Sequence, residues 1–395
     1  PFGSSKQFRF PFFSTQIVFP RSWRQLPVLP NSGVQKNHRL AVIWIFQPWL
    51  PTSKQSSNQE RQKNLAWRRE QLQAVKRMFE ENHEDITAAV RADLGGPKLR
   101  GIAETGSHMA AQDALDNLDK WAAPQKVPTP MTVSPTMLGK SYVRQEPKGV
   151  VLIIGPWNFP VELVIHPLVS AIAAGCPVVM KPSEVASNCA AIITRLVEKY
   201  LDPECFRVVN GAVAETTALL REPWDHIFYT GNGHVGRIVL KAAAEHLTPV
   251  TLELGGKSPV FIDKSAKMET VIARLSMVKW MNCGQICIAP DYVVVHKDRE
   301  EEFIKGMKEH IERYYGKDGS VKDSPYYGRI INSNHVHRLS GLLKETQGEV
   351  LTGGVNYIDP DSSFVPPTLV RGAKLGEPLL EEEIFGPVLP VVAVD

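Results

Sequence analysis

Two cysteines four residues apart, Cys283 and Cys287, are the candidate nucleophiles of this sequence. A thiol attacks a carbonyl carbon only as the thiolate, so it needs surroundings that lower its pKa or a neighbouring base. A candidate base, Glu253, stands 34 residues before Cys287, in the stretch Leu-Glu-Leu-Gly-Gly-Lys. A lone cysteine is more often a small packing residue. No Cys or His with ligand spacing stands nearby, so a metal site is not predicted.

Two further stretches accompany the cysteines in the sequence. Residues 155–160 read Gly-Pro-Trp-Asn-Phe-Pro, and residues 383–387 read Glu-Ile-Phe-Gly-Pro. Together with the Glu253 stretch and the Gly-Gln-x-Cys motif, they resemble the aldehyde dehydrogenase superfamily in order and spacing. The likeness is greatest to the class 3 branch, which acts on fatty and aromatic aldehydes, and it runs from about residue 60 to the end of the chain.

The resemblance implies the catalytic roles. Cys287 occupies the nucleophile position, whereas Cys283 is expected to be a packing residue. Asn158 and the backbone N–H of Cys287 would stabilise the negatively charged oxygen of the attacked aldehyde. Without the resemblance, the favoured explanation of Asn158 is a cap of the turn between Trp157 and Phe159. Glu253 would activate the water that hydrolyses the thioester, from a closed apolar site that raises its pKa. A salt bridge between Glu253 and Lys257 is the alternative.

The resemblance also implies a nicotinamide cofactor, NAD, with NADP possible. Lys181 and Glu184 would bind the adenosine ribose, and the Glu184 carboxylate would repel the extra phosphate of NADP. Glu383 would bind the nicotinamide ribose, with Phe385 against the ring. The full set of expected cofactor residues is Trp157, Lys181, Glu184, Gly231, Asn232, Gly236, Leu254, Glu383 and Phe385.

The elements that must position these residues follow from apolar runs. Residues 149–155 and 177–180 read as buried strands and residues 226–229 as a further strand, with helical segments between them. Such alternation predicts βαβ units and a parallel sheet, whose ligands lie beyond the carboxyl ends of the strands. Further strands are expected at 259–263, 292–296 and 388–394, and an amphipathic helix at 271–282. The predicted fold class is α/β: a Rossmann-like cofactor-binding domain plus a second α/β catalytic domain.

Three regions are expected along the chain. Residues 1–59 do not resemble the family, and we expect disorder or a gene-model artefact there. Residues 60–254 would form the NAD(P)-binding domain with the N-terminal helices and part of the oligomerisation region. Residues 255–395 would form the catalytic domain. Family members continue past the Glu-x-Phe-Gly-Pro motif, so this domain is expected to be incomplete, and a 60–395 fragment to aggregate and be inactive.

Composition restricts the partners. The net charge is +3, but residues 1–59 hold seven Lys or Arg and no acidic residue, so the rest carries −4. The basic balance therefore does not indicate a nucleic-acid partner. Five cysteines without regular spacing favour free thiols in a reducing compartment. The cytoplasm is the default location, with mitochondrial or membrane association left open, and a homodimer of the full-length protein is implied by resemblance.

The sequence therefore predicts oxidation of aldehydes to carboxylic acids through a cysteine thiohemiacetal and thioester. One alternative is a non-catalytic, truncated fragment of the same fold, although every catalytic position is intact. The other is a semialdehyde or acyl-linked reductase of the same superfamily. Glu253 argues against it, because such enzymes do not generally pair their cysteine with a deacylating glutamate.

Overall fold

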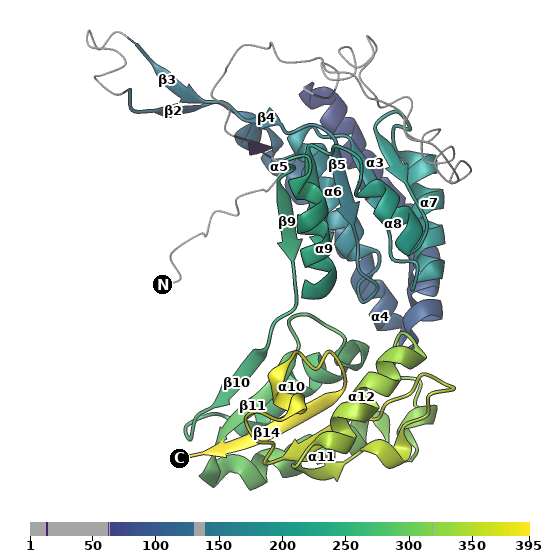
Figure 1. The fold of residues 1–395 in the computed structure, drawn as a ribbon, viewed down its shortest axis with the longest axis vertical. Coiled ribbons are helices and arrows are strands. Elements are labelled where there is room, and N and C mark those ends of the chain that lie inside the picture. Colours follow the sequence, from purple (N-terminus) through teal and green to yellow (C-terminus); the bar gives the residue numbers. More distant parts are fainter. Residues whose placement is uncertain (1–12, 15–61, 63, 130–138, 318) are drawn as a thin grey trace.

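The computed structural model describes residues 13–14, 62, 64–129, 139–317 and 319–395. They form two five-stranded sheets with helices packed on them, so the predicted α/β class is confirmed (Figure 1). The disorder predicted for residues 1–59 lies outside the described residues, except for Phe13–Ser14 (β1). This short strand pairs antiparallel with Glu146–Pro147 (β4).

The first sheet is parallel throughout, in the order β7-β6-β5-β8-β9. The apolar runs predicted to be buried strands form β5 and β6, in which every residue is buried. The bounds are Val151–Ile154 (β5), Val178–Lys181 (β6), Phe206–Val208 (β7), His226–Thr230 (β8) and Val250–Glu253 (β9).

Helices cover both faces of this sheet. One hydrophobic cluster joins one face to α3 (Leu65–Leu94), α5 (Ser107–Ala122), α6 (Glu162–Ala174) and α7 (Ser187–Tyr200). A second joins the opposite face to α8 (Val213–Leu219) and α9 (Gly233–Ala244). The short helices α4 (Lys98–Ala103) and η2 (Glu104–Gly106) connect α3 to α5. Residues Gln125–Val127 (β2) and Ser141–Val143 (β3) form a hairpin that projects from this part of the molecule (Figure 1).

The second sheet has the order β10-β11-β14-β13-β12. Four strands are parallel, and the edge strand β12 is antiparallel to β13. The strands are Ser258–Ile262 (β10), Pro290–His296 (β11), Glu349–Thr352 (β12), Thr368–Arg371 (β13) and Val388–Val394 (β14). The helices are Met268–Trp280 (α10), Glu300–Tyr315 (α11), Ser333–Glu345 (α12) and Pro378–Glu381 (α13), with 3-10 turns Met281–Gly284 (η3), Lys297–Arg299 (η4), Val321–Asp323 (η5) and Val355–Tyr357 (η6).

The helix before the cysteines is shorter than predicted. It was expected to reach residue 282, but α10 ends at Trp280. Three successive residues, Asn282, Cys283 and Gly284, then have φ of 50°, 52° and 69°. Left-handed backbone cannot continue a right-handed helix, and Asn and Gly tolerate it best. The chain therefore turns sharply just before Cys287.

Residues 254–257 connect the two sheets, between the end of β9 and the start of β10. In Figure 1 this connection runs from the upper, helix-covered sheet to the lower one. Candidate site residues from both sheets lie beside this connection: Glu253 ends β9, and Glu383 lies against Gly255.

Candidate active site

The candidate residues come from opposite edges of the two sheets. In the first sheet they follow the carboxyl ends of strands: Asn158 follows β5, and Glu253 is the last residue of β9. In the second sheet they precede the amino ends: Cys287 lies before β11 and Glu383 before β14. Parallel sheets usually hold ligands at their carboxyl ends. The first sheet follows that rule, and the second sheet contributes its other edge to the same site.

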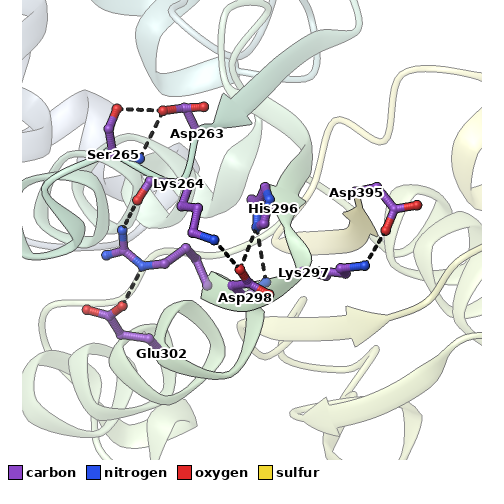
Figure 2. Close-up of polar contacts among 9 residues, drawn as sticks. Asp263, Lys264, Ser265, His296, Lys297, Asp298, Glu302 and Asp395 are labelled. Carbon is purple, nitrogen blue, oxygen red and sulfur yellow. Dashed lines mark hydrogen bonds and ion pairs between the residues drawn. The ribbon is translucent and has the colours of Figure 1, made fainter.

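The carboxyl edge of the second sheet is occupied by ion pairs instead (Figure 2). Lys264 Nζ lies 2.6 Å from Asp298 Oδ2, and Lys297 Nζ lies 2.5 Å from Asp395 Oδ1. These side chains are largely exposed, and exposed pairs of this kind contribute little to stability. Opposite charges match one another here, so this edge gives no sign of a second ligand site.

Cys287 is half-buried, whereas Cys283 is 1% exposed. Burial raises the pKa of the Cys283 thiol to about 12, so this thiol stays protonated at neutral pH. Cys283 packs in the core of the second sheet, which agrees with its predicted packing role. Cys287 is the more accessible of the two cysteines and therefore the better nucleophile.

The groups that shift the pKa of the Cys287 thiol are its neighbours in the site. Burial raises the pKa of the Cys287 thiol, and the charges of Glu383 and then Glu253 raise it further. The backbone N–H groups of Cys287 and Ile288 lower the pKa, because they bond to the thiolate. The thiol must therefore pass its proton to a base before it attacks. The two carboxylates close enough to affect its pKa are candidates for that base.

Asn158 is tied to the cysteine loop through both its side chain and its backbone. Its side chain is buried, and Nδ2 donates to the carbonyl oxygen of Gln285 at 3.0 Å. Asn282 Nδ2 donates back to the carbonyl oxygen of Asn158 at 2.9 Å. An amide carries two N–H donors, and the bond to Gln285 uses one of them. The side chain of Asn158 is therefore held between the two sheets. Its partner, Gln285, stands two residues before Cys287 in the sequence.

Gln285 fixes the same loop from the other side. It is fully buried, and Nε2 donates to the carbonyl oxygens of Asn282, at 2.9 Å, and Arg329, at 3.0 Å. Its Oε1 accepts from the backbone N–H of Ile331 at 3.0 Å. Three bonds satisfy most of the capacity of one amide. The left-handed turn that precedes Cys287 is therefore rigidly supported.

The surroundings of Glu253 differ from those predicted. We expected a closed apolar site, but the Glu253 side chain is exposed, because β9 is an edge strand. The alternative, a salt bridge with Lys257, is not formed either. Lys257 Nζ lies 2.5 Å from Asp291 Oδ2 and donates to the carbonyl oxygen of Glu382 at 2.8 Å. Lys257 thus holds the second sheet together, and Glu253 faces solvent.

Glu383 and Phe385 lie in a loop that several groups hold in place. Arg338 Nη2 donates to the carbonyl oxygen of Ile384 at 2.7 Å, and the N–H of Ile384 donates to Asp291 Oδ1 at 2.8 Å. Phe385 has a φ of 46°, unusual for an aromatic residue. Burial raises the pKa of Glu383, although the N–H of Gly256 opposes the shift.

Trp157 joins this loop to the first sheet. Its ring meets the ring of Phe385 edge to face, with centroids 5.4 Å apart and planes at 89°. On another side it contacts the ring of His335, with centroids 5.0 Å apart. Edge-to-face aromatic pairs are favourable beyond their buried area. The structure therefore brings together two of the predicted cofactor residues, Trp157 and Phe385, from different sheets.

The other predicted cofactor residues lie along the carboxyl edge of the first sheet. Lys181 is buried at the end of β6, and its Nζ donates to Glu184 Oε2 at 2.6 Å. Asn232 caps α9, accepting from the N–H of Val235 at 2.9 Å. A Cβ on Gly236 would lie 3.3 Å from the side chain of Leu254.

These groups fit a dinucleotide. A lysine–carboxylate pair can bind ribose hydroxyls, and a capped helix N-terminus beside a glycine, Gly231, can receive a pyrophosphate. A Cβ on Gly233 would meet only Arg237 Nη1, at 3.6 Å, so glycine is not required at that position.

Sequence reasoning missed the groups that support the site. Arg100, Glu104, Lys279, Asp291 and Arg338 are polar or charged residues in or near the interior beside the loops described above. None of them lies in the four motifs, and a charged residue outside a motif ordinarily suggests a solvated surface position. Of the residues that support the site, only Gln285 could have been found from the sequence, because it is the second residue of the Gly-Gln-x-Cys motif.

No cluster of three or more His, Cys, Asp or Glu side chains in the described part of the chain has the geometry to hold a metal ion. Of the described helices, none has the length and apolar character needed to span a membrane.

The chain is similar to a known protein family and to several of its members. The model of the aldehyde dehydrogenase family matches residues 51–395. Aldehyde dehydrogenase family 3 member A2 of Macaca fascicularis is 43% identical over 336 residues, covering 85% of this chain and 67% of that protein. The 4,4'-diaponeurosporen-aldehyde dehydrogenase of Staphylococcus aureus is 39% identical over 342 residues, covering 86% and 73%.

A solved structure agrees. The substrate-bound state of Staphylococcus aureus AldH superposes with a TM-score of 0.81 and 36% identity, over 90% of this chain and 75% of that one. The resemblance predicted from four short motifs is thus confirmed over most of the sequence. The chain belongs to the aldehyde dehydrogenase family, in its class 3 branch.

Proposed function

We propose that this chain oxidises aldehydes to carboxylic acids with NAD⁺ or NADP⁺, using Cys287 as nucleophile, Asn158 as oxyanion donor and Glu253 as general base. One observation carries the proposal. The Asn158 amide bonds to the Gln285 carbonyl at 3.0 Å, which holds an N–H donor from the first sheet beside the cysteine loop of the second. An accessible thiol next to a fixed donor is the arrangement that acyl chemistry at a carbonyl needs.

In the first step, the Cys287 thiol gives its proton to a base, for which Glu253 and Glu383 are the nearby carboxylates. The sulfur then bonds to the carbonyl carbon of the aldehyde, and the carbonyl oxygen becomes negatively charged. The second N–H of the Asn158 amide and the backbone N–H of Cys287 donate to that oxygen. Such donors are effective because they are already oriented when charge develops, and losing one typically costs ~10²–10³ in rate.

The cofactor residues would hold NAD(P)⁺, which when bound would accept the hydride that leaves the carbon bonded to the Cys287 sulfur, so that the thiohemiacetal becomes a thioester. Lys181 and Glu184 bind the adenosine ribose, and the start of α9 at Gly231, Asn232 and Gly236 receives the pyrophosphate. Glu383 binds the nicotinamide ribose. Trp157, Leu254 and Phe385 pack beside it, where the two sheets meet.

Glu253 then acts on water. Its exposed position at the end of an edge strand gives the carboxylate direct access to solvent, from which the hydrolytic water must come. The carboxylate takes a proton from water, and the hydroxide attacks the thioester carbon and expels the Cys287 thiolate.

We also propose that the full-length protein is a homodimer, with residues 60–254 as its cofactor domain and 255–395 as its catalytic domain. A relative 40% identical over 344 residues is named "Aldehyde dehydrogenase, dimeric NADP-preferring", from Rattus norvegicus. Ile238 and Leu240 on α9 are 48% and 46% exposed, and apolar side chains of this kind favour burial against a second copy. Light scattering after size exclusion should give twice the chain mass.

The test of function uses NADH absorbance, with hexanal and benzaldehyde as substrates and the full-length protein as enzyme. Cys287→Ala should abolish aldehyde-dependent NADH formation and leave NAD binding measurable, because only the nucleophile is lost. Cys283→Ser should retain most activity, since Cys283 is buried. Faster iodoacetamide labelling of Cys283, together with loss of turnover in Cys283→Ser, would contradict the assignment.

A further inference from the structure

A buried ion pair lies behind the loop that carries Asn158. Arg100, in α4, and Glu104, at the start of η2, are one helical turn apart, with Arg100 Nη2 2.9 Å from Glu104 Oε1. Their side chains are 3% and 0% exposed. Burying two charges carries a large desolvation cost, and a well-packed apolar pair at such a place is often as stable. The pair therefore calls for an explanation other than stability.

Arg100 contacts the loop at Asn158 itself. Its Nη2 donates to the carbonyl oxygen of Asn158 at 2.7 Å, across 58 residues of sequence. The guanidinium also lies over the ring of Phe159, with Cζ 4.3 Å from the ring centroid. One planar cation thus holds two successive residues, by a charge-assisted hydrogen bond and a cation–π contact.

Glu104 holds the same loop a few residues further on. Its Oε2 accepts from the backbone N–H of Val161 at 2.8 Å and from that of Glu162 at 3.2 Å. These N–H groups belong to the start of α6, where the helix has no partners of its own for them. The carboxylate therefore fixes the far end of the segment whose near end Arg100 fixes.

The Arg100 bond converges with a contact from the cysteine loop. The Asn158 carbonyl oxygen accepts from Arg100 on one side and from Asn282 on the other, while the Asn158 amide donates to Gln285. Both the backbone and the side chain of Asn158 are thereby restrained. A displacement of about 1 Å in such a donor is enough to cost ~10²-fold in rate.

We propose that Arg100 and Glu104 are positioning residues, which clamp residues 158–162 from behind so that the Asn158 amide is aimed at the oxygen of the aldehyde attacked by Cys287. The inference rests on the proposed oxyanion role of Asn158. Arg100 and Glu104 act through the backbone of that segment and need not touch the substrate.

The test is a double-mutant cycle between Arg100→Lys and Asn158→Ala in the full-length protein. Lysine keeps the buried charge but lacks the planar guanidinium, whose Nη2 lies within reach of both Glu104 Oε1 and the Asn158 carbonyl oxygen and whose plane contacts the Phe159 ring. Arg100→Lys alone should lower kcat/KM for hexanal at least about tenfold, with the Kd for NAD within about twofold of wild type. In the Asn158→Ala background it should lower kcat/KM by no more than about twofold, because the donor it positions is already gone.

Two further variants separate positioning from folding. Arg100→Met combined with Glu104→Gln removes both charges, so no unpaired charge stays buried, and it should show the same dependence on Asn158. Lys98→Met is the matched control on the same helix. Lys98 pairs with Glu84 on the surface at 2.7 Å, away from residues 158–162, so this variant should keep wild-type kcat/KM.

The outcomes distinguish the two claims. An equal loss from Arg100→Lys in both backgrounds, or wild-type kcat/KM in both Arg100 variants, overturns the positioning role alone. Wild-type turnover in Asn158→Ala overturns the oxyanion role proposed above, and the positioning role with it.

Discussion

At the scale of single residues, the thiol of Cys287 is shaped by two carboxylates from different sheets. Glu383 and Glu253 both raise the pKa of Cys287, after the larger effect of burial. The two N–H groups that stabilise the thiolate act in the opposite direction. The site therefore keeps the sulfur protonated until a base removes its proton, and it keeps Glu253 in contact with water.

Glu253→Gln should separate the two halves of the reaction. The pre-steady-state burst of NADH should remain, while steady-state turnover falls by ~10²–10⁴, because no base activates the hydrolytic water. Mass spectrometry should then find the acyl group on Cys287. The variant should also shift iodoacetamide labelling of Cys287 to lower pH, since one of the charges that raises its pKa is removed. Loss of the burst would instead place Glu253 before hydride transfer.

Lys279 gives a pH-dependent prediction. Burial lowers its pKa to about 8; the charges of Asp291 and Glu383 oppose the shift and Lys257 adds to it. An unfolded lysine has a pKa of about 10.4, so between about pH 8 and 10.4 the unfolded chain binds more protons and stability rises with pH. The unfolding free energy of wild type minus that of Lys279→Met should therefore increase by about 2 kcal/mol from about pH 7.5 to 9.5.

Denaturant titrations at those two pH values measure this difference. Taking it against the methionine variant cancels the tyrosines and cysteines that titrate in the same range. A difference that does not change with pH would mean that Lys279 keeps its ordinary pKa in the folded protein.

The motifs led to the residues proposed to react but not to the groups around them. Cys287, Asn158 and Glu253 lie in short stretches whose types and spacing are recognisable. Arg100 lies 58 residues from Asn158, and its contact exists only after α4 packs against the end of β5. Periodicity and local chemistry carry no information about such a contact. The predicted closed site around Glu253 failed for the same reason, because it required knowing that β9 would be an edge strand.

At the scale of elements, we propose that the end of β6 sets cofactor preference. Glu184 accepts from Lys181 at 2.6 Å, so its carboxylate would both repel the extra phosphate of NADP and occupy the nearest ammonium. Glu184→Gln should raise the ratio of kcat/KM with NADP to that with NAD by about tenfold or more, because it removes the repulsion and frees part of Lys181. Glu198→Gln, an exposed position on α7, is the matched control for loss of one charge. An unchanged ratio in Glu184→Gln would mean that Glu184 does not reach the adenosine ribose.

Elements were predictable where one signal dominated. Apolar runs identified β5 and β6, because strands buried on both faces hold apolar residues at nearly every position. The end of α10 was not predictable from its apolar period, which continues past Trp280. The helix ends because Asn282, Cys283 and Gly284 adopt left-handed φ. Glycine is required at position 284, where a Cβ would lie 2.3 Å from the carbonyl oxygen of Gly386.

At the scale of the whole molecule, the site forms where the carboxyl edge of one sheet faces the amino edge of the other. The connection at residues 254–257 therefore does more than join the sheets (Figure 1). The N–H of Gly256 bonds to Glu383, and Gly255 lies against the same carboxylate. The glycines of this connection thereby link the position of Glu383 to the relative placement of the two sheets.

The two adjacent glycines should differ sharply when each is replaced by alanine. A Cβ on Gly255 would lie 1.8 Å from Glu383 Oε2, whereas a Cβ on Gly256 would meet nothing within 4 Å. The atom in the way is the end of a flexible side chain, so Gly255→Ala should displace Glu383 while the Tm stays near wild type. We expect Gly255→Ala to weaken NAD binding and slow hydride transfer by about tenfold each, on the scale of one lost charge-assisted hydrogen bond.

Gly256→Ala has room for its methyl group and keeps the N–H that bonds to Glu383, so it should retain most activity and serves as the control. Titration of NAD by fluorescence and the rate of the NADH burst measure both effects. Equal behaviour of the two variants would show that Glu383 is not held against this connection. A large fall in Tm for Gly255→Ala alone would show that the carboxylate cannot move aside, and that the connection itself is strained instead.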